Sequence, residues 1–144
     1  MHLLDVNVLV YAYRADAPRH DVYRVWLERL VNGDESFAVA DLVFSGFLRV
    51  VTHPKVFNPP SPLDKALAFV NILRARPNFV ALAPGARHWE LFVRLCETGQ
   101  AKGNLVPDAY LAALAIESGC TWVTSDGDFD RFPGLRVLHP LHDS

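Results

Sequence analysis

Short apolar runs alternate along this chain with longer segments whose apolar residues recur every three or four positions. Five of the short runs predict buried strands, at 2–5, 36–40, 78–83, 120–125 and 135–139. Because strands separated by helical segments pair most readily in parallel, the alternation predicts an α/β fold with a mostly parallel five-stranded sheet covered on both faces. In such sheets, ligands bind beyond the carboxyl ends of the strands.

The longer segments contain residues that commonly begin or end helices. We expect helices at 6–13, 18–31, 41–52, 61–75, 86–99 and 107–119. Pro18 suits a first helical turn, Asp41 is placed to cap the third helix, and Gly119 is placed to end the last one. The four prolines between His53 and Pro62 predict an irregular loop.

The length of 144 residues fits one domain spanning 1–144. No run reaches the roughly 18 apolar residues of a membrane-spanning helix. Since Asp5 interrupts the first apolar run, we also expect no secretory signal and a cytoplasmic location. Cys96 and Cys120 lie among apolar residues, so buried thiols are expected, with a structural disulfide as the minor alternative.

The net charge of −2 neither favours nor excludes a nucleic-acid partner. A strongly basic domain would favour one on charge alone. An acidic protein can nevertheless meet phosphate through a divalent ion held by clustered carboxylates, because the ion supplies the local positive charge. The charge balance therefore leaves the function open.

Four aspartates lie where the predicted topology would gather them at one sheet edge. Asp5 ends the first strand, Asp126 ends the fourth and Asp128 follows it, while Asp108 begins the helix that leads into the fourth strand. Neighbouring carboxylates repel one another, and a bound Mg²⁺ or Mn²⁺ removes that penalty. Such an ion can activate water and neutralise charge on a phosphate, so the pattern predicts metal-assisted phosphodiester hydrolysis.

Each aspartate also has a purely structural interpretation. Asp5, with Asn7 two residues later, could cap a helix. Asp108 in a first helical turn interacts favourably with the helix dipole in any case. Asp126 and Asp128 are ordinary turn residues. The joint placement of all four at predicted strand ends favours an active site.

Four segments, in order, cover nearly the whole chain: LLDVNVLVYA, DLVFSGFLRVVTHPKVF, VPDAYLAALAIESGCTWVTSDGDF and PGLRVL. Together they resemble a PIN domain, and specifically the VapC-type toxins of bacterial type II toxin–antitoxin systems. The resemblance implies an α/β/α sandwich and a Mg²⁺- or Mn²⁺-dependent endoribonuclease. It also implies inhibition by a cognate VapB-type antitoxin, and a homodimer. The pattern of residues by itself demonstrates neither partner.

The resemblance also assigns roles to individual residues. It implies that Asp5, Asp108 and Asp126 are catalytic and bind the metal, with Asp128 as a less uniform fourth ligand. Asn7 matches a polar residue expected to hold the first aspartate by hydrogen bonding. Thr124 matches a hydroxyl position near the last acid.

One position departs from the family pattern. Many relatives carry a glutamate in the third helix where this chain has Gly46, which offers no ligand to a metal. Three or four carboxylates can still hold one Mg²⁺ with waters, and a second ion is left open. Asp41 could partly substitute, although helix capping is the favoured interpretation.

Basic and aromatic residues add weaker indications. Arg49, one turn beyond Gly46, could face the same cleft and contact RNA phosphates, with a solvated surface charge as the alternative. Trp89 and Trp122 fall at positions typical of a core.

Two other functions stay open. A haloacid-dehalogenase-like phosphatase also has an aspartate after its first strand, but it needs a second aspartate two residues later, where this chain has Asn7. A non-catalytic RNA-binding module would retain the fold without the chemistry.

Overall fold

The computed structural model describes residues 1–142 as alternating strands and helices. The elements are β1 (His2–Leu4), α1 (Val6–Tyr13), α2 (His20–Val31), β2 (Phe37–Ala38), α3 (Asp41–Val51), α4 (Leu63–Arg74), β3 (Phe79–Val80), α5 (His88–Thr98), α6 (Leu105–Ser118), β4 (Thr121–Val123), the 3-10 helix η1 (Gly127–Arg131) and β5 (Val137–Leu138).

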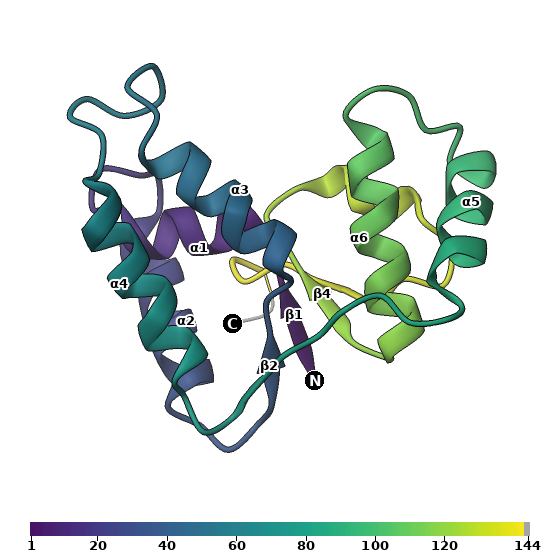
Figure 1. The fold of residues 1–144 in the computed structure, drawn as a ribbon, viewed down its shortest axis with the longest axis horizontal. Helices are drawn as coiled ribbons and strands as arrows, with labels where there is room; N and C mark the ends of the chain where they lie inside the picture. Colours follow the sequence, from purple (N-terminus) through teal and green to yellow (C-terminus); the bar gives the residue numbers. More distant parts are fainter. Residues whose placement is uncertain (143–144) are drawn as a thin grey trace.

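The five strands form one sheet in the order β3-β2-β1-β4-β5, and all four strand pairs are parallel. Helices α1 to α4 cover one face of the sheet, and α5 and α6 cover the other (Figure 1). The predicted α/β/α sandwich is confirmed. Chain order reverses between β1 and β4, the point at which an open α/β sheet has a crevice for ligands.

The two central strands are apolar because both of their faces are covered. Leu3 and Leu4 of β1 pair with Trp122 and Val123 of β4, and all four side chains are fully buried. A central parallel strand reads as a continuous apolar run for this reason. The polar residue that follows each run therefore marks the edge of the sheet.

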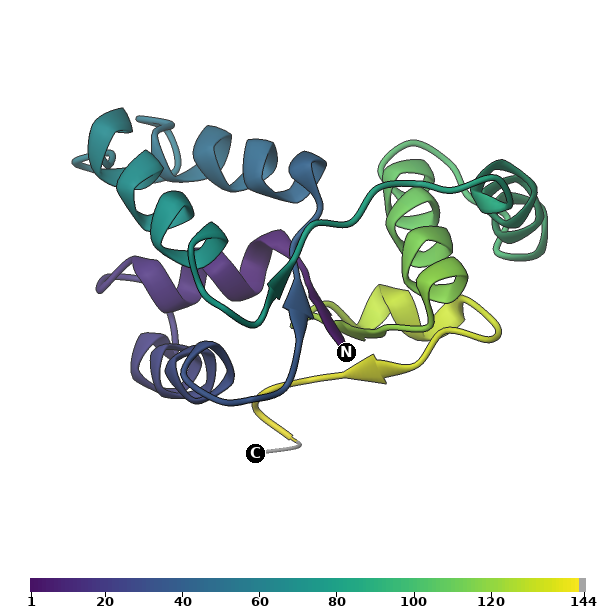
Figure 2. The same ribbon diagram turned by 60° about the horizontal axis from the view of Figure 1, so that its bottom comes forward.

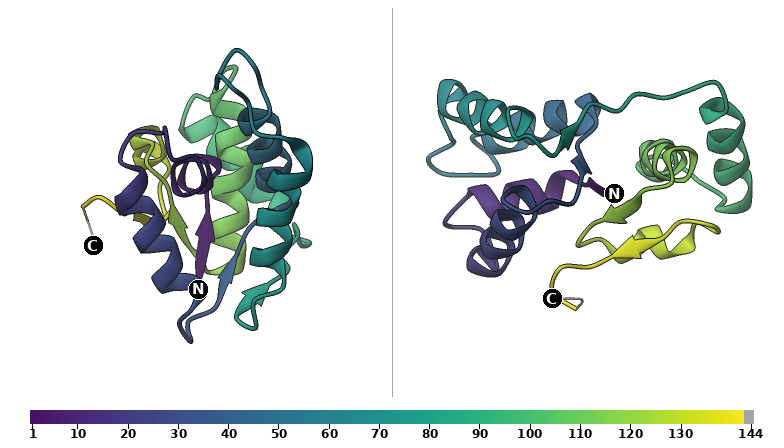
Figure 3. Two further views of the ribbon diagram at one scale, coloured as in Figure 1. Left: turned by 90° about the vertical axis from the view of Figure 1, so that its left-hand side faces the viewer. Right: turned by 90° about the horizontal axis from the view of Figure 1, so that it is seen from below.

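Helix α6 lies directly on the sheet, and α5 packs on the outer side of α6 (Figures 2 and 3). This outer position corrects the expectation for Trp89. The side chain of Trp89 on α5 is 67% exposed, whereas Trp122 is buried as expected. Helical periodicity identified a helix at α5 but could not show that its outer surface faces solvent.

Four helix starts differ by two residues from the sequence prediction: α2, α4 and α5 begin later than predicted, and α6 begins earlier. Helix α2 begins at His20 after Arg19, which has a φ of 59°, so Pro18 lies before the helix. Helix α6 begins two residues before Pro107, which stands in the first turn, where its missing N–H is not needed. Gly119, with a φ of 70°, ends α6 as predicted.

The prediction that Asp41 caps α3 is wrong. Ala40 occupies the N-cap position, and Asp41 is the first residue of the helix. Its side chain is 94% exposed, and its Oδ1 accepts a hydrogen bond of 3.4 Å from Arg74 of the neighbouring helix α4. Asp41 therefore points away from the crevice and does not replace the missing glutamate.

Both cysteines are free thiols, Cys120 buried and Cys96 partly buried. Within the part of the chain that the structure describes, no helix is long and apolar enough to cross a membrane.

Candidate active site

Asp5 stands at the carboxyl end of β1 and is also the N-cap of α1. Its Oδ1 accepts a hydrogen bond of 2.7 Å from the backbone N–H of Val6. The residue is only 7% exposed, and burial raises the pKa of its carboxyl although hydrogen bonds to Thr124 and Val6 oppose the shift. The helix-cap interpretation of Asp5 is therefore confirmed, and its role in an active site stays a prediction.

Thr124 and Asn7 fix the other oxygen of Asp5. The Thr124 hydroxyl donates to Oδ2 of Asp5 at 2.7 Å, and the Asn7 amide donates to the same oxygen at 3.2 Å. Oδ1 of Asn7 accepts a hydrogen bond of 3.0 Å from the backbone N–H of Ser125. This network ties the ends of β1 and β4 together and holds the Asp5 carboxylate in one orientation.

Asp126 lies just beyond β4, at the start of η1. Its backbone N–H donates to the Thr124 hydroxyl at 3.0 Å, and its Oδ1 accepts a hydrogen bond of 2.9 Å from the N–H of Asp128. Asp126 thus caps η1 with one carboxylate oxygen. Asp128 is exposed and lies outside the set of described residues that line the cavity.

Asp108 projects from the first turn of α6 and is partly buried. Its pKa is raised to about 6, first by desolvation and then by the negative charges of Asp5, Asp126 and Asp128, with Arg131 acting in the opposite direction. The four aspartates that the sequence singled out therefore influence one another electrostatically. Their repulsion is the penalty that a cation would relieve.

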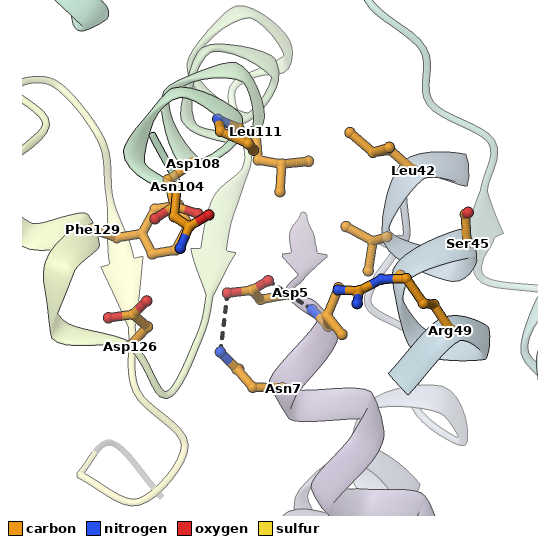
Figure 4. A pocket seen from close by; sticks show the side chains of 14 residues that line it. Asp5, Asn7, Leu42, Ser45, Arg49, Asn104, Asp108, Leu111, Asp126 and Phe129 are labelled. Carbon is orange, nitrogen blue, oxygen red and sulfur yellow. Dashed lines mark hydrogen bonds between the residues drawn. The ribbon is translucent and has the colours of Figure 1, made fainter. Parts of the chain in front are cut away.

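One cavity of about 460 Å³ brings three of these acids together. It lies between α3, α6 and the ends of β1 and β4, and it is lined by Asp5, Val6, Asn7, Leu42, Val43, Ser45, Gly46, Arg49, Asn104, Pro107, Asp108, Leu111, Asp126 and Phe129. Asp108 and Asp126 lie on one side of Asp5, and the α3 residues Leu42, Ser45 and Arg49 lie on the other side (Figure 4).

The PIN-domain family model matches residues 2–135 of this chain. The chain belongs to the PIN-domain family. Its similarity to a VapC ribonuclease of Mycobacterium bovis extends over nearly the full length, at 48% identity over 141 residues that cover 98% of this chain and 96% of that protein. These matches place the chain in the VapC group, as the sequence resemblance predicted, and in a family other than the haloacid-dehalogenase-like phosphatases.

Solved structures of low sequence identity share this PIN fold. VapBC2 from Rickettsia felis, bound to a promoter DNA fragment, superposes with a TM-score of 0.68 at 22% identity, covering 96% of this chain and 97% of that one. A toxin–antitoxin complex from Klebsiella pneumoniae gives a TM-score of 0.63 at 19% identity, covering 97% of this chain and 98% of that one.

Gly46 lines the cavity, at the position where the sequence resemblance leads us to expect a glutamate. A Cβ atom at this position would stand 3.0 Å from Cγ2 of Val6, which is closer than ordinary van der Waals contact. The backbone of α3 therefore packs against Val6, the residue whose N–H holds Asp5. A side chain at position 46 would require Cγ2 of Val6 to move by a few tenths of an ångström.

The donor set of this PIN domain fits a hard divalent cation. Among the described residues, no three acidic, histidine or cysteine side chains form a ready-made metal cage. Mg²⁺ needs no such cage, because it keeps several waters and is commonly bound through one or two carboxylates. Asp5, Asp108 and Asp126 offer carboxylate oxygens to one cavity, which is the chemistry that Mg²⁺ and Mn²⁺ select.

Leu42, Ser45 and Asn104 are among the cavity residues that the sequence pattern did not single out. Leu42 and Ser45 are exposed residues of α3, and Asn104 precedes α6. Asn104 lies four positions before Asp108, so helical spacing could have placed the two on one face. No spacing pattern in the sequence indicates that Leu42 and Ser45 line the cavity. Their exposure depends on the separation of α3 from α6.

Proposed function

We propose that this protein is the ribonuclease of a type II toxin–antitoxin pair, and that it hydrolyses RNA phosphodiester bonds with Mg²⁺ or Mn²⁺ held by Asp5, Asp108 and Asp126. The convergence of these three carboxylates on one cavity, from three separate parts of the chain, carries the proposal. The 48% identity to a named ribonuclease over nearly the whole length supports it.

The bound ion would polarise a phosphate oxygen and lower the pKa of an attacking water. The chain contributes orientation. Asp5 cannot rotate freely, because Val6 and Thr124 hold its two oxygens at 2.7 Å and Asn7 adds a third donor. A metal ligand that is fixed by such hydrogen bonds keeps its orientation when substrate enters. Much of the catalytic advantage of a preorganised site arises from this fixed orientation.

Residues of the opposite wall suit an RNA substrate. Arg49 can pair with a phosphate, and Ser45 brings a neutral hydrogen-bonding group to the same wall, whereas Asn104 brings one to the acid side, beside Asp108. Leu42 supplies an exposed apolar surface beside them. Since Leu42, Ser45 and Arg49 face the acids across one cavity, a phosphodiester bound between the walls would lie within reach of both.

A VapB-type antitoxin is the expected inhibitor, in keeping with the toxin–antitoxin complexes that share this fold. Co-expression of the neighbouring small reading frame with a tagged copy of this protein should yield a stable, inactive complex. Light scattering of the isolated protein would test the predicted homodimer.

Mapping cleavage ends in total RNA tests the enzymatic proposal. The wild-type protein should generate discrete new ends with Mg²⁺ and none with chelator, and Asp5→Asn should generate none under either condition. Cleavage that persists in chelator or in Asp5→Asn would refute the proposal. RNA binding without cleavage by the wild type would instead support the non-catalytic module.

A further inference from the structure

We propose that this active site works with one divalent ion, and that the guanidinium of Arg49 supplies the positive charge that a second ion would supply in a two-metal nuclease. The inference rests on the proposed ribonuclease function. It concerns the α3 wall of the cavity, where the chain departs from the common PIN pattern.

The α3 wall contains no carboxylate. Its lining residues are Leu42, Val43, Ser45, Gly46 and Arg49. All three acids of the cavity come from the opposite side or the floor, on β1, α6 and the segment after β4. Asp41, the acid of α3 itself, is turned outward to Arg74. A second ion between the phosphate and α3 would therefore have no charged ligand on that wall.

The packing at Gly46 also disfavours a ligand there. A Cβ atom at position 46 would lie 3.0 Å from Val6 Cγ2, and Val6 is β-branched, so its side chain has few alternative rotamers. The N–H of Val6 donates to Oδ1 of Asp5 at 2.7 Å. Any side chain at position 46 that pushes Val6 aside would also disturb the first metal ligand. The close approach of α3 to the start of α1 is thus matched to the absence of the glutamate.

Arg49 is the one cationic residue among the described residues that line the cavity. Within residues 1–142, no hydrogen bond or ion pair engages its side chain, in contrast to Arg14, which is paired with Asp16, and Arg74, which is paired with Asp41. Its guanidinium is therefore available to an incoming anion. A guanidinium presents donors in a planar fork that matches two phosphate oxygens.

A site with a glutamate and a second ion and a site with only Arg49 carry the same net charge beside α3. A glutamate and a second divalent ion together add a net single positive charge, which is the charge of one guanidinium. In the hydrolysis, a water oxygen bonds to phosphorus and the water gives up one proton, while the bond from phosphorus to the leaving ribose oxygen breaks and that oxygen gains one proton. Arg49 takes no part in this proton transfer. It stabilises charge on the phosphate oxygens as they become more negative.

Two measurements test this arrangement. The first is calorimetric titration of the metal-free protein with Mn²⁺, for the wild type and for Arg49→Ala. We expect one ion per chain in both proteins, with similar affinity, because Arg49 binds the phosphate rather than the metal. Two ions per chain in the wild type would overturn the proposal.

The second measurement is single-turnover cleavage of a short RNA identified from the mapped ends. Arg49→Ala should lower the rate constant about 10²- to 10³-fold. Added guanidinium ion should restore part of the loss, and Arg49→Lys should recover little because lysine lacks the fork. Arg94→Ala, an exposed arginine on α5 outside the cavity, serves as the matched control and should cleave normally.

The outcomes separate the two levels of the proposal. If Arg49→Ala cleaves RNA as fast as the wild type and melts at the same temperature, the role of Arg49 is overturned. The ribonuclease proposal is then left intact. A wild-type protein that binds Mn²⁺ but cleaves no RNA would refute the ribonuclease proposal and the role of Arg49 with it.

Discussion

The hydroxyl of Thr124 donates a 2.7 Å hydrogen bond to Oδ2 of Asp5, which lies 119 positions earlier in the chain. Thr124 is fully buried, and its oxygen also accepts the N–H of Asp126 at 3.0 Å. One hydroxyl thus links two of the proposed metal ligands across the central strands. The position of the site is consequently tied to the pairing of β1 with β4.

Replacing Thr124 with valine should therefore weaken both folding and metal binding. The change keeps the shape but leaves the N–H of Asp126 without its partner, at a cost of about 1–3 kcal/mol in the free energy of unfolding. Mn²⁺ affinity should fall about 10- to 100-fold, as is typical when a residue that orients a metal ligand is lost. Denaturant unfolding and calorimetry measure the two effects. Thr124→Ser keeps the hydroxyl and is the control; equal losses in both variants would contradict this account.

Asp108→Asn should stabilise the metal-free protein while removing its function. The carboxylate of Asp108 is repelled by Asp5, Asp126 and Asp128, and an amide is not. In chelator at pH 7.5, we expect the melting temperature to rise by a few degrees above that of the wild type, whereas RNA cleavage should be lost. Asp34→Asn, in an exposed loop outside the cavity, is the control. A lower melting temperature for Asp108→Asn would show that the repulsion is not the dominant effect.

The pKa of about 6 for Asp108 predicts how pH affects the metal-free protein. Because the folded-state pKa lies above the ordinary aspartate value, folding favours the protonated acid. Its contribution to stability is therefore largest at low pH and declines as pH rises from about 4 through 6. Melting curves in chelator should show this decline, and Asp108→Asn should show a smaller one, because the raised pKa of Asp5 acts in the same sense. Mn²⁺ affinity should change in the opposite sense and increase over the same range, since a metal ligand must lose its proton.

Gly46→Glu introduces the glutamate that is common in the family. It tests whether a glutamate at this position can act as a metal ligand in this chain. Position 46 is already in close contact with Val6, so we expect the larger side chain to displace Val6 and, through it, Asp5. Mn²⁺ binding should weaken, and RNA cleavage should slow. A gain of a second ion with faster cleavage would show that the wall accommodates a ligand without disturbing Asp5.

The sequence predicted the order of the elements and the positions of the acids because both follow from burial. Leu3 and Leu4 are apolar since β1 is covered on both faces, and Asp5, although itself buried, is the first residue after the strand. The same rule located Asp126 after Trp122 and Val123. The pattern of apolar strands followed by acidic residues was therefore enough to predict that these acids lie at one edge of the sheet.

Contacts between elements were outside the reach of the sequence pattern. Asp41 has the composition of a helix cap, but its side chain is engaged by Arg74 from another helix. Trp89 follows helical spacing, yet α5 forms an outer layer against α6 and leaves the indole in solvent. Likewise, the space between α3 and α6 decides that Ser45 and Asn104 face the acids. None of these relationships is encoded in a local period or a capping preference.

Diffraction from crystals soaked in Mn²⁺ tests the central claim most directly. The account predicts one anomalous peak per chain in the cavity, about 2.1 Å from carboxylate oxygens of Asp5 and of at least one of Asp108 and Asp126, completed by waters. Crystals of Asp5→Asn grown and soaked alongside should lack the peak. Manganese bound only elsewhere on the chain, or an unchanged peak in Asp5→Asn, would contradict the claim that these acids converge to share one cation.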